Sequence, residues 1–299
     1  MDHMVYFFLH LDPFYIEKLV LSIAGGAIGA GGALLVYYLK VSYDKRSEEL
    51  KRKRLLHNKL SYFNSLLNSI INATETQITL NRKYAKESKE KPFDLIYFNL
   101  SINEDLRRIC EVMDQELIYQ SYLEFLNKSN SGKEILQALN DCDYIYEASR
   151  LIKEKIKVVN LKTEETSLEY SKLSEKIMDE AGTEMNEIKK RTSEYEKDPF
   201  WIFINNSFNN YYSKITEDQT IPLREEHFIR PFKIGLVHNF EKQNIADRLS
   251  TMCKECTHKF TYLIRLSNDL SEEIENQTNE IEKALPYLKE IKSKIINTL

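Results

Sequence analysis

The first feature in the pattern of apolar and polar positions is a long segment without charged residues. Residues 19–39 read LVLSIAGGAIGAGGALLVYYL and contain no charged side chain. At about 1.5 Å per residue a helix of this length measures roughly 31 Å, enough to cross the hydrocarbon core of a bilayer. Aromatic residues flank it on both sides, as in an interfacial belt: Phe14, Tyr15, Tyr37 and Tyr38. The pattern predicts a membrane-spanning helix.

The glycines of this segment raise a different interpretation, the phosphate-binding turn of a dinucleotide fold. That turn needs the spacing G-x-G-x-x-G. Gly29 and Gly31 match its first two positions, but Leu34 stands where the third glycine belongs. A Walker loop needs a lysine directly after its last glycine, and the first lysine beyond the cluster is Lys40. The spacing therefore argues against a nucleotide site.

Small residues instead form two adjacent ridges along the predicted span. One ridge consists of Gly25, Gly29 and Ala33, and the other of Ser22, Gly26 and Ala30. Ridges of this kind let membrane helices pack closely. We expect the span to contact other copies of itself, with the general glycine richness of membrane helices as the alternative explanation.

Beyond the span, apolar residues recur at spacings of three and four, as on the buried face of a helix. The clearest seam consists of Leu56, Leu60, Phe63, Leu67 and Ile70. Helical patterns continue from about residue 133 to 197 and from about 244 to the end. Between them, Asp198-Pro199 indicates a new helix with an N-cap and a proline in its first turn.

The predicted fold class is all-α. Only three glycines follow the span and residues 93–198 contain no proline, which disfavours a turn-rich β fold. The expected order is an extracytoplasmic tail at 1–18, a transmembrane helix at 19–39, a juxtamembrane helix at 40–91 and a cytoplasmic helical domain at 92–299. Within that domain, about 150–197 and about 262–297 should form long antiparallel, coiled-coil-like arms.

Charge is distributed unevenly around the span. Few charges precede it, whereas a basic stretch follows: Lys40, Lys45, Arg46, Lys51, Arg52, Lys53 and Arg54. The positive-inside rule then places the bulk of the chain in the cytoplasm, with the span in the inner membrane of a bacterium. The same stretch is a candidate for contact with anionic lipid headgroups, and an ordinary solvated helix face is the alternative.

Whole-chain composition bears on partners and on redox state. The net charge of −4, from 42 basic and 46 acidic residues, gives no global field that would attract nucleic acid. Four scattered cysteines do not form a secreted disulfide framework. Cys253 and Cys256 are the only pair at metal-ligand spacing, but zinc needs two further ligands. We expect buried structural cysteines and no metal or cofactor.

Two Arg/His pairs are candidates for ribonuclease chemistry. HEPN-type helical nucleases use an arginine, then a run of four to six residues, then a histidine. Arg52 and His57 match this arrangement, and Arg230 and His238 are one residue too far apart. Lys53 stands where that family carries a small polar residue or histidine. In a chain this rich in basic residues, chance matches are the competing explanation.

The segment EEHFIRPFKIGLVHNF, residues 225–240, mixes basic residues with three phenylalanines. One interpretation is a pocket for a small anionic ligand or a contact for an unidentified protein. The other is an amphipathic helix whose aromatic side chains fill the core. The sequence leaves both open.

A membrane helix, a basic juxtamembrane stretch and a helical cytoplasmic domain together resemble the bacterial membrane-anchored proteins of phage defence, including abortive-infection proteins. The resemblance implies oligomerisation and membrane damage on infection, and it carries over no functional residue. We therefore expect a non-enzymatic, oligomerising, single-pass membrane protein that acts as an interaction module or membrane effector. A membrane-tethered HEPN-like ribonuclease and a ligand-gated pore-forming effector are the alternatives.

Overall fold

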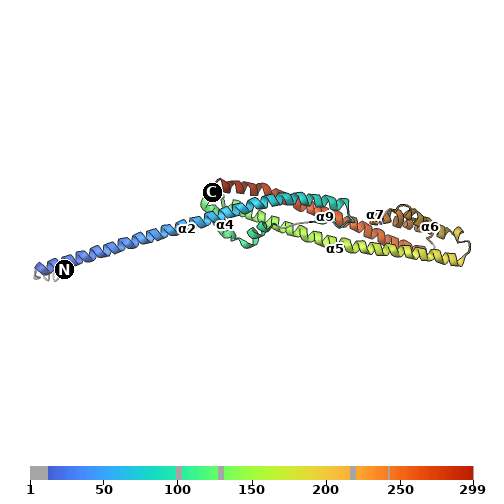
Figure 1. Ribbon diagram of the computed structural model, residues 1–299, viewed down its shortest axis with the longest axis horizontal. Coiled ribbons are helices and arrows are strands. Elements are labelled where there is room, and N and C mark those ends of the chain that lie inside the picture. Colours follow the sequence, from blue (N-terminus) through green and yellow to red (C-terminus); the bar gives the residue numbers. More distant parts are fainter. Residues whose placement is uncertain (1–12, 99–102, 127–130, 216–219, 242, 299) are drawn as a thin grey trace.

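The computed structural model describes residues 13–98, 103–126, 131–215, 220–241 and 243–298. All regular structure within these residues is helical, which confirms the predicted all-α class. The molecule is a long rod, and one bare helix extends from it at the N-terminal end (Figure 1).

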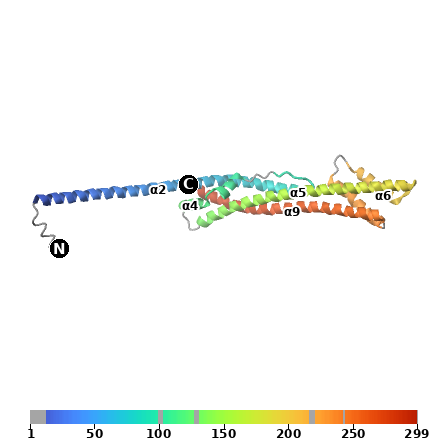
Figure 2. The ribbon, with the colours of Figure 1, turned by 90° about the horizontal axis from the view of Figure 1, so that it is seen from below.

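The bare helix is the first part of α2 (Pro13–Glu90), which is 78 residues long. The predicted span and the predicted juxtamembrane helix are therefore one continuous element. Its side chains remain largely exposed as far as Leu55, and burial begins abruptly at Leu56. Figure 2 shows the same division from a second direction, with the packed part of α2 lying along the rod.

The packed half of α2 joins α4 (Gln115–Leu126), α5 (Ser131–Arg191) and α9 (Asn244–Ile296) around a proximal core. The seam predicted from the spacing of three and four is buried throughout: Leu56, Leu60, Phe63, Leu67 and Ile70. This core contains residues from both sides of residue 91, the expected end of the juxtamembrane helix.

Helices α5 and α9 run antiparallel along most of the rod. Lys294 pairs with Glu134 at 3.0 Å, Lys155 with Glu273 at 2.6 Å, and Arg248 with Glu180 at 2.9 Å. From one pair to the next the residue number rises along α5 and falls along α9, as in two antiparallel helices. In this register the arm expected at 262–297 lies opposite the first half of α5, and only part of the arm expected at 150–197 faces it.

The second half of α5 and the start of α9 belong to a separate distal core. It is completed by α6 (Pro199–Tyr212), α7 (Ile221–Arg224) and α8 (Arg230–Asn239). Asp198 caps α6 as predicted, because its carboxylate accepts hydrogen bonds from the backbone N–H groups of Phe200 and Trp201, both at 2.9 Å.

Short irregular turns connect or extend these helices. Two are π-helical: η1 (Arg108–Val112) continues α3 (Glu104–Arg107), and η3 (Glu225–Ile229) joins α7 to α8. A 3₁₀ turn, η2 (Tyr195–Lys197), precedes α6. π-Helical turns are rare and often lie at functional sites, which makes the surroundings of η3 a candidate site.

Candidate membrane-spanning segment and candidate side-chain sites

The first candidate site is the apolar part of α2. Every described side chain from Leu19 to Lys40 is exposed, including Leu34, Leu35 and Val36. Among the described residues, α2 is the one helix long and apolar enough to cross a membrane, and none of its apolar window is buried. A core helix of a soluble protein would hide such residues. No part of the chain that the structure describes covers this segment.

The glycines of this segment contact no other described part of the chain. A Cβ added to Gly25, Gly26 or Gly29 would meet nothing within 4 Å. Gly235 in α8 is different, because a Cβ there would lie 2.2 Å from Cε2 of Phe203. The predicted packing positions Ser22 and Ala33 are exposed, and the side chain of Ala30 lies outside the described residues.

The basic stretch after the span lies on a bare stretch of helix. All seven of its predicted lipid-contacting side chains are exposed: Lys40, Lys45, Arg46, Lys51, Arg52, Lys53 and Arg54. Lys53 is directed toward acidic neighbours, with its Nζ 3.4 Å from Oε1 of Glu49 and 4.0 Å from Oε1 of Glu124. Because Glu124 belongs to α4, this stretch ends where the proximal bundle begins.

The structure does not assemble a nuclease site from Arg52 and His57. The two residues are five positions apart on one α-helix, which places them about 140° apart around its axis. The His57 ring packs edge-on against Phe125, with ring centroids 5.9 Å apart. The histidine therefore contacts α4, whereas Arg52 is directed toward a different side.

The second pair is also separated. Arg230 begins α8 and His238 lies in its last turn, about 12 Å farther along the axis. Nε of Arg230 lies 4.0 Å from Oε1 of Glu225, and His238 is exposed. The phenylalanines of this segment contribute to the distal core, where the Phe203 and Phe232 rings stack with centroids 5.3 Å apart.

A buried charged cluster at η3 was missed by the sequence interpretation. Glu225 is 1% exposed, and its Oε2 accepts a hydrogen bond of 3.1 Å from the Tyr170 hydroxyl. Nη1 of the buried Arg224 donates a hydrogen bond of 2.6 Å to Oγ of Ser174. The available signal was an acid at a core position, because Glu225 continues the apolar repeat of Phe228, Phe232 and Leu236.

This cluster ties α5 to η3 at the centre of the distal core. Burial raises the pKa of Tyr170, and the neighbouring Glu225 carboxylate raises that pKa further. The phenol therefore remains a neutral donor to the carboxylate. Breaking one partner of a buried charged network is costly, so the cluster fixes how the distal helices pack. Its geometry accounts for a structural role.

Cys253 and Cys256 also lie in the distal core and are buried free thiols. Burial raises the pKa of both, that of Cys256 to about 12. A thiol with so high a pKa is a poor nucleophile. Among the described residues no group of three or more histidine, cysteine or acidic side chains is placed to hold a metal ion.

No protein-family model, no curated protein and no solved structure matches the chain. The side-chain geometry and the exposed apolar segment are therefore the basis for the function proposed below.

Proposed function

We propose that this chain is a single-pass membrane protein that crosses the bilayer at residues 19–39 and holds a helical rod on the cytoplasmic side as a non-enzymatic interaction module or membrane effector. The observation that carries the proposal is the exposure of every described apolar side chain of α2 between Leu19 and Leu39. Burying one such side chain is worth about 1.5–3 kcal/mol, so leaving the whole row in water is strongly unfavourable. A bilayer supplies the missing burial.

The continuity of α2 limits which basic residues reach the lipid. With the span ending at Leu39, Lys40 lies among the headgroups, and Arg46 lies about 10 Å farther along the helix. Arg54 lies about 22 Å beyond the span, well outside a headgroup layer of roughly 5–8 Å. Lys40 lies within this layer, and the long side chains of Lys45 and Arg46 extend back to it. These three are the lipid-contacting residues in this proposal, and the later basic residues form a charged neck.

Self-association of the span is the second part of the proposal. The open space around Gly25, Gly26 and Gly29 supports it, because no described part of the chain lies within 4 Å of a Cβ added at these positions. Gly29→Ile should remove higher-order assembly between spans, measured as mass in detergent. Gly182→Ile is a matched control. Gly182 lies in the rod, and a Cβ added there also meets nothing within 4 Å.

Membrane anchorage is tested by extraction. The full chain should stay in the membrane pellet after alkaline carbonate treatment, whereas a chain starting at Lys45 should be released. Release of the full chain by carbonate would refute the span. Orientation is tested separately with a cysteine placed at Glu226, which a membrane-impermeant maleimide should label only after the cytoplasmic face is opened.

The resemblance in architecture extends the proposal to a phage-defence role in a bacterial inner membrane. Cells that carry the chain should show fewer phage plaques, and cells with Gly29→Ile should lose that protection if assembly of the span damages the membrane. His57→Ala and His238→Ala should leave protection unchanged. Loss of protection in either histidine variant would favour the ribonuclease alternative instead.

A further inference from the structure

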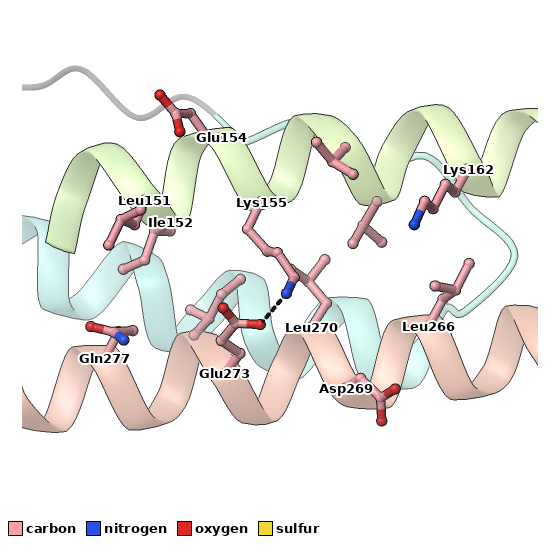
Figure 3. Close-up of a pocket in the computed structure, with 13 residues that line it drawn as sticks. Leu151, Ile152, Glu154, Lys155, Lys162, Leu266, Asp269, Leu270, Glu273 and Gln277 are labelled. Atoms are coloured by element: carbon pink, nitrogen blue, oxygen red, sulfur yellow. Dashed lines mark ion pairs between the residues drawn. The ribbon is translucent and has the colours of Figure 1, made fainter. Parts of the chain in front are cut away.

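An apolar groove of about 460 Å³ runs between α5 and α9 on the outside of the rod (Figure 3). Its floor includes the buried side chains of Ile152, Leu270 and Ile274. On the α5 side, Leu151 is 51% exposed and Val158 is 47% exposed. Large aliphatic side chains at seven-residue spacing are therefore half uncovered along this groove, as at a helix–helix interface that lacks its partner.

The groove continues toward the membrane end of the rod. A second hollow between the same two helices is lined by Gln137 and Tyr144 from α5 and by Tyr287 from α9. The Tyr144 hydroxyl donates a hydrogen bond of 3.4 Å to Oε1 of Gln277, which lines the first hollow, so the two adjoin. Residues 137–162 of α5 span about 38 Å, and two helices side by side are about 20 Å wide. The face of the α5/α9 pair therefore measures on the order of 800 Å² per copy, which is the area that each partner buries in a standard protein interface.

Opposite charges line the two sides of the groove. In the first hollow α5 contributes Lys155 and Lys162 together with one acid, Glu154, whereas the charged residues of α9 are both acidic, Asp269 and Glu273. Figure 3 shows Lys155 reaching across to Glu273, and their ion pair measures 2.6 Å. In the second hollow one pair of charges has the opposite arrangement: the acid, Asp141, belongs to α5 and the base, Lys283, belongs to α9.

This arrangement is self-complementary under one symmetry. Because α5 and α9 are antiparallel, Lys155 and Glu273 lie at the same level along the rod. A two-fold axis parallel to the rod places α5 of one copy opposite α9 of the other without changing that level. Lys155 and Lys162 then face the partner's Glu273 and Asp269, and Asp141 faces the region of the partner's Lys283. Copies anchored by α2 in one membrane lie parallel, as this axis requires.

We propose that the α5/α9 groove is the interface of a parallel two-fold dimer between copies in the same membrane. The proposal rests on the membrane anchorage proposed above for its parallel orientation. It is distinct from contacts between spans, because the groove lies wholly within the rod. The occupant of the groove is a second copy of this chain, with aliphatic side chains buried at the centre and ion pairs at the edges.

Charge reversal provides the main test, carried out on the full chain with Gly29→Ile so that spans do not contribute. One variant carries Lys155→Glu and Lys162→Glu, and the other carries Asp269→Lys and Glu273→Lys. Each alone places like charges across the interface and should weaken the dimer at least about 10-fold, and mixing the two should restore dimers. Mass in detergent reports all three states, and thermal unfolding by circular dichroism confirms that each variant is folded.

Three outcomes would overturn the groove dimer. The Gly29→Ile chain could be monomeric before any charge is changed, the reversed variants could dimerise as well as their parent, or the mixture could fail to pair. A monomer that resists carbonate extraction would leave the membrane proposal intact and remove only this interface. A chain released by carbonate would refute the span, and the same mass measurement without detergent would still test the groove.

Cross-linking tests the direction of pairing. Single cysteines at Leu151, Val158 and Lys162 should each cross-link to the same position of a second copy with a short bismaleimide in vesicles. Lys83→Cys is the control, because Lys83 is exposed on α2 away from the groove. Cross-linking only between Leu151→Cys and Lys162→Cys copies would show antiparallel pairing and contradict association within one membrane.

Discussion

The two halves of α2 are one continuous helix with opposite surroundings. Phe63 in the packed half is fully buried, whereas Leu34 in the bare half is 68% exposed. Large aliphatic side chains occur in both halves, so their presence alone does not decide which half is buried. The difference lies in the partner, because α9 and α4 cover residues 56–90 and no described part of the chain covers residues 19–39. In the function proposed above, a bilayer covers these side chains while the helix satisfies its own backbone hydrogen bonds.

The largest effect on stability should come from removing a buried side chain from the packed half of α2. Phe63→Ala removes a fully buried ring from the proximal core and should lower the free energy of unfolding by about 3–5 kcal/mol. Leu34→Ala in the bare half should leave that free energy unchanged. Urea unfolding of the rod in detergent, followed by circular dichroism, measures both. Equal losses from the two variants would show that the bare half folds against the rod.

The next effect should come from placing a charge in the bare half. Leu34→Lys adds a charge near the end of the predicted span, and charged residues at the centre of a span cost about 2.5–3.5 kcal/mol on insertion scales, so a smaller but measurable loss is expected here. Gly29→Lys, near the middle, should approach the full value. Leu50→Lys is the matched control in the charged neck. The measurement is the fraction of chain that resists carbonate extraction, and equal resistance of all three variants would contradict the span.

The third prediction concerns the stability changes caused by the same substitution at two glycines, Gly235 and Gly29. Gly235→Ala forces its Cβ against the Phe203 ring, which is itself stacked on Phe232, and should destabilise the distal core by about 1–3 kcal/mol. Gly29→Ala meets nothing and should not affect unfolding of the rod. Thermal unfolding distinguishes them. Adding Phe203→Leu to Gly235→Ala should recover part of the loss, and no recovery would place the cause elsewhere.

Local pattern was sufficient for much of this architecture. The seam from Leu56 to Ile70 could be read from its spacing because each position depends only on the helix period. The start of α6 was equally readable, since Asp198 caps it through its own backbone neighbourhood. The apolar run of α2 needed only length and charge. Features fixed within one or two turns of chain were therefore accessible from sequence.

Features that depend on distant contacts were not accessible. The π-helical turn at Glu225 is held by Tyr170, which lies 55 residues earlier in the chain, and no local signal specifies that pairing. The register of α5 against α9 depends on pairs such as Lys294 with Glu134. The groove lined by Leu151 and Val158 exists only once that register is set. The candidate interface therefore required the structure.

The smallest effect concerns the ion pairs along the packed half of α2. Arg82 donates to Glu282 of α9 through Nη2 at 2.6 Å and through Nη1 at 3.3 Å, and both side chains are about half exposed. Such pairs are worth about 0–1 kcal/mol, so a double-mutant cycle of Arg82→Gln and Glu282→Gln should give a coupling energy in that range, smaller still in high salt. Urea unfolding of the four chains measures it. A coupling comparable to the loss from Phe63→Ala would mean that charge rather than burial holds α2 on α9. The exposed half would then differ from the packed half in its ion pairs, and the argument that exposed apolar side chains mark the bilayer would lose its basis.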